Sequence, residues 1–235
     1  MEKLRDDRMT ARRRRSGFTL LELLIVMSLL AILAGVVVPA TGSMLRSQGR
    51  RTTLQEMELL ADAVLDFYRD TAQFPATPLD LLSSAVPGWS GPYLRGAVVD
   101  PWSNQSSYAV DGFGNPYSFG TSGYELTIAS DGPDRTPSTA DDIDLVISAI
   151  PVLRELTMAE LRVINAAVAQ YNSVFLSTTP LSGNWSVARA ALESAGFLPP
   201  SASYDRDAWG TDYTGNPPGV SPLTAVISPN IAVPP

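Results

Sequence analysis

The apolar residues of this chain form one continuous segment followed by shorter periodic ones. Residues 18–40 carry a single charged side chain, Glu22, and as a helix they span roughly 35 Å, enough to cross a bilayer core. Beyond them, apolar residues recur at helical spacing. These are Leu54, Met57, Ala61, Val64 and Tyr68, with Leu60 and Phe67 widening the stripe. We predict one long helix from about Phe18 to about Thr71, with a membrane half and an amphipathic half.

Short β-like runs separated by Gly, Pro and Asn follow this helix and predict a small antiparallel sheet. The runs cover residues 108–110, 117–119, 124–129 and 145–148. Before them, Thr77 and Pro78 have the features of the start of a short helix. The pattern therefore predicts an α+β domain over residues 42–150.

A second, smaller set of similar elements occupies residues 151–235. Thr157 and Glu160 have the spacing of a capping box, and a helical apolar stripe follows. A short helix over 185–194 closed by Gly196 and a strand over 223–227 complete the set. The order of landmarks predicts a duplicated α+β repeat with a Pro-rich tail, and chance similarity is the alternative. The proposed pairs are Tyr68 with Tyr171, Leu94 with Leu198, Asp100 and Trp102 with Asp207 and Trp209, Tyr108 with Tyr213, and Asn115-Pro116 with Asn216-Pro217.

Composition excludes several kinds of chemistry. The chain contains no cysteine and no histidine, so disulfides, thiolate chemistry and a Ser-His-Asp catalyst are all ruled out. Any bound metal should be a hard cation held by oxygen ligands.

Charge is divided sharply along the chain. Residues 1–17 carry seven basic and three acidic side chains, whereas the whole chain has a net charge of −7. The remainder is therefore strongly acidic, which argues against nucleic-acid binding. The basic end instead predicts that the N-terminus stays in the cytoplasm while the rest crosses the membrane.

The basic segment and the apolar run that follows it admit two ordinary explanations, a secretory signal peptide or a plain membrane anchor. The run is longer than a usual signal-peptide core, and no clear A-x-A cleavage site ends it. Glu22 is also unusual, since a charge within an apolar span costs on the order of a few kcal/mol and commonly marks function.

The residues Gly17-Phe18-Thr19-Leu20-Leu21-Glu22 closely resemble the class III signal of type IV pilins and type II secretion pseudopilins. The resemblance implies that a prepilin peptidase cuts between Gly17 and Phe18, removes residues 1–17 as a leader, and methylates Phe18. It also implies a type IV pilin-like fold, with residues 18–41 forming a transmembrane and filament-core helix.

Two further positions match the family, Glu22 as the fifth mature residue and Pro39 as the twenty-second. A buried Glu22 needs a cation, and the α-amino group of a neighbouring Phe18 can supply one, which would set the register of subunits in a filament. Pro39 removes a backbone donor and should kink or locally melt the helix. Alternatively, it simply ends the membrane span.

The globular part resembles the major pseudopilin of type II secretion over about residues 12–148. The resemblance rests on the long helix, Phe74-Pro75, Gly91-Pro92-Tyr93-Leu94, Asp100-Pro101-Trp102 and the β-region. Gly114-Asn115-Pro116-Tyr117 comes later than is usual, which implies an enlarged loop.

An acidic loop lies between the last two predicted strands of this part. It carries Asp131, Asp134, Asp141, Asp142 and Asp144, and it does not fit the EF-hand template. On its own such a loop is either a solvated turn or a calcium site, because calcium prefers several oxygen ligands.

Resemblance to the major pseudopilin favours a structural calcium ion (Ca2+) in this loop. It implies side-chain ligands at Asp134, Asp141 and Asp142, and backbone carbonyls near Asp131 and Thr136. Arg135 stands where the family usually has glycine, which puts the neighbouring carbonyl ligand in doubt.

Three functions follow from these features. The first is a non-enzymatic subunit of a type II secretion pseudopilus that drives protein export from the inner membrane, with its globular part in the periplasm. Its expected partners are the prepilin peptidase, other copies of itself, minor pseudopilins, the inner-membrane assembly platform and lipid. The second is a type IV pilus pilin for adhesion, motility or DNA uptake. The third is a membrane-tethered enzyme or binding protein that uses the same leader.

Overall fold

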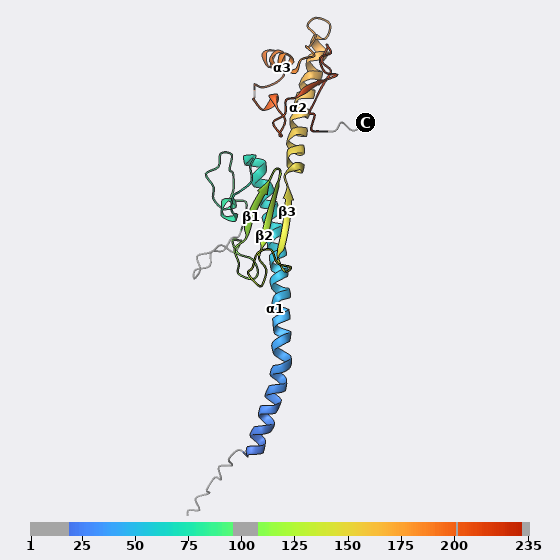
Figure 1. Ribbon diagram of the computed structural model, residues 1–235. Helices are drawn as coiled ribbons and strands as arrows, with labels where there is room; N and C mark the ends of the chain where they lie inside the picture. Colours follow the sequence, from blue (N-terminus) through green and yellow to red (C-terminus); the bar gives the residue numbers. More distant parts are fainter. Residues whose placement is uncertain (1–18, 96–107, 201, 232–235) are drawn as a thin grey trace, which may run out of the picture. The chain divides into compact units, whose positions relative to one another are not determined.

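The computed structural model describes residues 19–95, 108–200 and 202–231, with the backbone alone for residues 34–41 (Figure 1). The chain forms two compact units, Met1–Gln48 and Gly49–Pro235. Helix α1 (Leu20–Thr71) contributes residues to both units and confirms the predicted long helix. Gly17, Phe18 and the Asp100–Trp102 motif lie outside the described residues.

The helical backbone of α1 continues through Pro39 and Gly42. Of the two effects expected of Pro39, a kink or a local melt of the helix, the helical backbone shows no melt, since one missing donor is tolerated when the flanking turns stay helical. In the first unit, the described side chains of residues 19–33 and 42–48 are exposed. Among the described residues, no helix combines the length and apolar character needed to span a bilayer. The predicted span and a kink at Pro39 stay predictions.

A three-stranded antiparallel sheet lies against the second half of α1 (Figure 1). Its strands are β1 (Ser118–Ser122), β2 (Glu125–Ser130) and β3 (Ile143–Ser148), in the order β1-β2-β3. Three of the four predicted strands are thus confirmed, whereas residues 108–110 form only an isolated bridge, Val110 with Pro116. The expected short helix is the 3-10 turn η1 (Pro78–Leu81).

The core of this first globular part joins α1 to the sheet. Its fully buried members include Met57, Leu60, Val64 and Phe67 of α1, and Leu126 and Ile128 of β2. Burial of a side chain of this size contributes about 1.5–3 kcal/mol. Leu54, which the sequence pattern placed in the buried stripe, is exposed.

The second globular part contains two helices and a two-stranded sheet. The elements are α2 (Ile150–Phe175), α3 (Trp185–Ser194), η2 (Ala202–Asp205), β4 (Thr214–Asn216) and β5 (Ala225–Ile227). Helix α3 and the strand near residue 225 were predicted, and Gly196 ends α3 with a positive φ of 77°. The core residues Leu161, Ile164, Val168 and Tyr171 follow Met57, Leu60, Val64 and Phe67 at a constant spacing of 104 positions. Tyr171 therefore corresponds to Phe67 and not to Tyr68.

The predicted capping box at Thr157 and Glu160 is wrong. Helix α2 begins at Ile150, with Pro151 in its first turn, so Thr157 lies inside the helix and is fully buried. Its Oγ1 instead accepts a hydrogen bond from the Ala208 backbone N–H at 3.1 Å. The same residue pattern serves a tertiary contact because the helix starts two turns earlier than the local signal indicates.

A small buried cluster joins the end of α1 to the start of α2. Tyr68 packs with Val152 and Leu153, and Trp209 lies against the same cluster. An ion pair between Arg69 and Glu155, at 3.4 Å, borders this junction. The two globular parts therefore contact each other through apolar side chains at the place where the chain passes from β3 into α2.

Candidate functional site

The N-terminal site begins at the start of α1. The Glu22 backbone N–H donates to Thr19 Oγ1 at 3.2 Å, so Thr19 caps the helix. Glu22 is exposed and lies in the first turn, where the helix dipole favours a carboxylate. Sequence reasoning gave Glu22 an assembly role only and missed this local one, which a Thr-x-x-Glu pattern would have indicated.

The acidic loop, residues 131–142, connects β2 to β3. Its two ends are held together because Ser130 pairs with Ile143 in the sheet. Three residues in the loop adopt a positive φ, Gly132 at 64°, Arg135 at 60° and Ser138 at 66°. Arg135 thus adopts the left-handed conformation that glycine would take, at a cost of roughly 1–2 kcal/mol.

Three of the predicted ligands come together in this loop. Carboxylate oxygens of Asp134, Asp141 and Asp142 all lie within 4.8 Å of one another. Two ligands at about 2.3–2.6 Å from one cation can be no more than about 5 Å apart, so this spacing fits a shared calcium ion. Asp131 and Thr136 lie in the loop but do not belong to the triad.

Gly132 packs closely against Asp141, with no room for a side chain between them. A Cβ atom placed on Gly132 would lie 2.6 Å from the Asp141 carbonyl oxygen and 3.4 Å from its Oδ2. A side chain at this position would therefore displace the backbone that carries one triad residue. The donor set and this close approach both suit a hard cation bound by oxygen.

Local hydrogen bonds orient the three carboxylates. Asp142 Oδ2 accepts from the Ser138 N–H at 2.6 Å, and Asp134 Oδ1 accepts from the Thr136 N–H at 2.9 Å. Thr139 Oγ1 lies 2.8 Å from Asp141 Oδ1 and 3.0 Å from Asp142 Oδ1. Sequence reasoning missed Thr139, whose hydroxyl lies between two triad members and 3.2 Å from the Thr136 carbonyl, so that its single proton can be donated to one of these three acceptors.

A buried aspartate lies beside the acidic loop. Asp111 is 5% exposed, and its Oδ1 accepts hydrogen bonds from the N–H groups of Phe113 and Asn115, at 2.9 and 2.8 Å. Its Oδ2 accepts from Ser130 Oγ and Asn115 Nδ2, at 2.5 and 3.3 Å. We call Asp111, Asn115 and Ser130 the first hub. It satisfies a buried carboxylate with four donors, as a stable buried charge requires.

The second globular part contains a matching arrangement around Asp207. Its Oδ1 accepts from the N–H groups of Trp209 and Thr211, at 3.0 and 2.8 Å. Its Oδ2 accepts from Ser228 Oγ and Asn230 Nδ2, at 2.6 and 2.9 Å. We call Asp207, Ser228 and Asn230 the second hub.

The two hubs pair residues differently from the sequence expectation. Asp207 makes the hydrogen bonds that Asp111 makes, and Tyr213 makes the contact that Tyr117 makes, whereas Asp100 lies outside the described residues and its pairing with Asp207 stays a prediction. Tyr117 Oη donates to Glu56 at 2.9 Å, and Tyr213 Oη donates to Glu160 at 2.7 Å. Two shared patterns could have found these residues: Thr-x-x-Glu at 53 and 157, and Asp-x-x-Gly-x-x-Tyr at 111 and 207.

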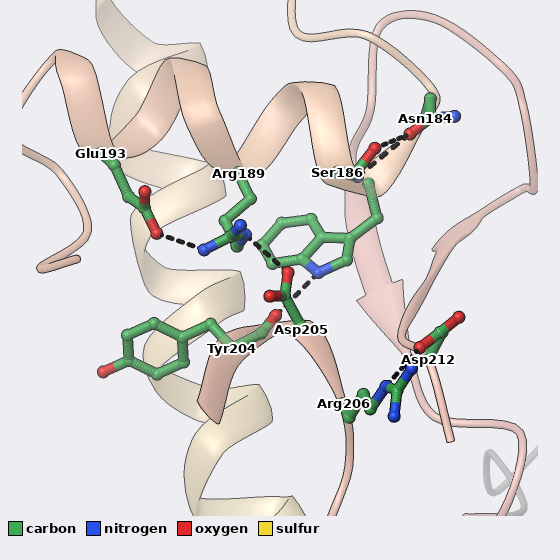
Figure 2. A network of polar contacts seen from close by, with 9 residues as sticks. Asn184, Ser186, Arg189, Glu193, Tyr204, Asp205, Arg206 and Asp212 are labelled. Carbon is green, nitrogen blue, oxygen red and sulfur yellow. Dashed lines mark hydrogen bonds and ion pairs between the residues drawn. The ribbon is translucent and has the colours of Figure 1, made fainter. Parts of the chain in front are cut away.

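One hollow in the second part has a volume of about 500 Å³ and lies between the start of α3 and the chain around β4. Each charged residue that lines it has a partner: Arg206 pairs with Asp212 at 3.0 Å, and Asp205 pairs at 2.8 Å with Arg189, which lies outside the lining. Figure 2 shows these pairs, with Arg189 also bound to Glu193. The charges of this hollow are therefore already neutralised within the protein.

Stability is expected to fall in alkali because of the two buried tyrosines. Burial, followed by the nearby Glu56 carboxylate, raises the pKa of Tyr117 above its usual 10.0, and burial and Glu160 raise the pKa of Tyr213 likewise. Above pH 10 the unfolded chain ionises these tyrosines while the folded chain does not, so stability is present below pH 10 and is lost as pH rises beyond it.

Above pH 10 the expected slope approaches about 1.4 kcal/mol per pH unit for each tyrosine, and urea unfolding between pH 8 and 11 measures it. Tyr117→Phe and Tyr213→Phe should each reduce the slope, whereas Tyr124→Phe, at an exposed position, should leave it unchanged. Equal slopes in all variants would contradict this assignment.

Residues 12–38 match the family model described as the prokaryotic N-terminal methylation motif. The chain is also similar to proteins named type II secretion system core protein G. The protein from Pseudomonas aeruginosa is 36% identical over 128 residues, which is 48% of this chain and 89% of that protein. Those from Klebsiella pneumoniae and Aeromonas hydrophila are 34% and 33% identical, over 55% and 56% of this chain and 93% and 92% of their own lengths.

The chain belongs to the type II secretion system core protein G family. It is therefore a major-type pseudopilin, a structural protein and not an enzyme. Core protein G relatives match along most of their own length, yet about half of this chain lies outside each match. No solved structure gives a significant match.

Proposed function

We propose that this core protein G family member is a pseudopilus subunit that carries two pseudopilin-like heads on one N-terminal helix. The observation that supports this proposal most strongly is the 36% identity to a core protein G across 89% of that protein. The subunit is processed between Gly17 and Phe18, anchors in the inner membrane through residues 18–41, and then assembles into a filament that drives protein export. Its globular part, residues 42–235, lies in the periplasm.

The methylation motif over residues 12–38 supports this processing, because it contains both residues of the proposed cleavage site. In the filament, Glu22 pairs with the α-amino group of Phe18 in a neighbouring subunit, and Pro39 marks the end of the membrane segment. The partners are the prepilin peptidase, other copies of the chain, minor pseudopilins, the assembly platform and lipid.

Calcium is the proposed ligand of Asp134, Asp141 and Asp142, with carbonyl ligands near Asp131 and Thr136. The spacing of the three carboxylates supports it. A bound divalent cation would offset the mutual repulsion of the carboxylates and hold the two arms of the loop together.

The second head, residues 151–235, is proposed to be a pseudopilin-like repeat of residues 42–150. The shared helix spacing of 104 positions and the matching hubs support this. Residues 214–235 contain no Asp or Glu, so this stretch of the repeat offers no counterpart of the acidic loop.

Deletion of the gene, scored for both secreted proteins and surface pili, tests the function. Secretion should be lost, and the intact gene should restore it, while surface pili persist. Loss of pili with secretion intact would favour the type IV pilus alternative.

Mass spectrometry of the purified protein tests processing separately. The mature chain should begin with methylated Phe18, and Gly17→Val should leave the leader attached and fail to restore secretion. A mature N-terminus at Met1 or near Ala40 would refute the pilin-like maturation.

A further inference from the structure

We propose that Asn115 is a positioning residue, which ties the acidic loop to helix α1 through the first hub. Asn115 is 4% exposed. The acidic loop begins directly after Ser130, which is the third member of the hub and the last residue of β2. The calcium-dependent part of the inference rests on the proposed calcium site, whereas the ordering of the loop by Asn115 does not.

The Asn115 amide has two donors and uses both. One Nδ2–H group donates to Asp111 Oδ2 at 3.3 Å, and the other donates to the Gly132 carbonyl at 2.5 Å. The Gly132 N–H in turn donates to Ser130 Oγ at 3.3 Å. Gly132 is thus held by the hub through both its carbonyl and its amide.

Gly132 connects this hub to the triad. Gly132 packs so closely on Asp141 that a Cβ on it would lie 2.6 Å from the Asp141 carbonyl oxygen. A displacement of Gly132 is therefore expected to displace Asp141 as well. Buried groups in tight contact do not shift independently. The position of one carboxylate of the triad therefore depends on the hydrogen bond from Asn115.

The other side of the hub is attached to α1. The Gly112 N–H donates to Thr53 Oγ1 at 3.0 Å, and Thr53 Oγ1 donates to the Gly49 carbonyl at the same distance. Gly112 approaches the helix so closely that a Cβ on it would lie 2.3 Å from the Gly49 oxygen. The path from helix to triad is continuous: Thr53, Asp111, Asn115 and Gly132 are buried, whereas Gly112 is exposed.

The second hub shows what this arrangement becomes without an acidic loop. Thr211 stands where Asn115 stands in the first hub, and Asn230 supplies the amide to Asp207 instead. The remaining donor of Asn230 goes to Thr211 Oγ1 at 2.8 Å, so the network closes on itself. Within the described part of the chain, the first hub sends a hydrogen bond onward into a loop with carboxylates and the second hub does not.

This comparison provides a matched pair of variants. Asn115→Thr and Asn230→Thr each remove an amide that donates to a hub aspartate, but only the former removes the bond to the Gly132 carbonyl. Both are made in the full chain in detergent. Calcium affinity is measured by titration calorimetry, and amide exchange of residues 131–142 is measured by mass spectrometry in EGTA.

Asn115→Thr should weaken calcium binding by about 10–100-fold, as loss of an outer-shell contact does, and should speed exchange in the loop. Asn230→Thr should change neither the calcium affinity nor the exchange of the loop, although it should lower the melting temperature by about as much as Asn115→Thr does. Ser130→Ala, which removes the acceptor of the Gly132 N–H, is the second variant should Asn115→Thr not fold, and it should act in the same direction.

Unchanged affinity and unchanged exchange in Asn115→Thr would overturn the inference, as would equal effects in Asn230→Thr. If the parent chain binds no calcium, the calcium part of the proposed function fails. In that case the exchange rates alone test the role of Asn115. Faster exchange of residues 131–142 in EGTA in Asn115→Thr supports its positioning role.

Discussion

Replacing Asp141 with asparagine is expected to abolish the stabilisation of the full chain by calcium. Asp141 is the half-buried triad member that Gly132 and Thr139 both contact. Asparagine keeps the shape of the side chain but removes the negative charge and one of the oxygens available to a cation. The repulsion between the remaining carboxylates falls as well, so the variant should not lose stability in EGTA.

At a calcium concentration 100 times the dissociation constant, the parent chain should gain about 2.7 kcal/mol in the free energy of unfolding. Asp141→Asn should gain almost nothing, whether measured by thermal or by urea unfolding with calcium and with EGTA. Asp144→Asn is the matched control, because Asp144 is exposed on β3 just beyond the triad. A full calcium response in Asp141→Asn would show that the triad is not the site.

The second large effect is expected from Asp207→Asn in the second hub. Asparagine places an amide where Asp207 Oδ2 now accepts from Ser228 Oγ and Asn230 Nδ2, so donors face donors in a buried site. Hydrogen bonds to a charged group contribute about 1.5–3 kcal/mol each, and a loss of about 2–4 kcal/mol is expected. Calcium affinity should not change, because no described hydrogen bond of this hub reaches the acidic loop.

Asp212→Asn is the control for this prediction. Asp212 pairs with Arg206 at the surface, with 77% of its side chain exposed, and an exposed pair contributes about 0–1 kcal/mol. Urea unfolding, combined with hydrogen exchange of α2 and α3, measures the change and its location. Similar losses in both variants would contradict the role of Asp207 as a buried anchor.

Local patterns predicted the helices, because the backbone hydrogen bonds of a helix join residues close in the sequence. The spacing of Met57, Leu60 and Val64 predicts the amphipathic half of α1, and residues 185–194 carry their own start and end signals. Strands β2 and β3 were also found, because β-branched and apolar residues alternate between turn residues. The register between these strands needed the structure.

The same reasoning failed where a local pattern serves a distant contact. Thr157 and Glu160 have the spacing of a capping box, but they bind Ala208 and Tyr213, about fifty residues away. The repeat equivalences expected from the sequence differ from those of the hubs for a related reason. Trp102 and Trp209 are conspicuous in the sequence, whereas the shared aspartate turns carry only the less conspicuous pattern Asp-x-x-Gly-x-x-Tyr, and the hydrogen bonds that define them needed the structure.

By itself, the sequence determined the class of this protein: the basic leader, the apolar helix with Glu22, the helical stripe and the acidic loop all follow from residue type and short-range spacing. Only the tertiary structure decided how the loop is held. The bonds between Thr53 and Gly112 and between Asn115 and Gly132 connect residues 59 and 17 positions apart, and such contacts depend on which helix face packs on which turn. Local propensity carries no information about that choice, because it is made by the shared burial of α1 and the sheet.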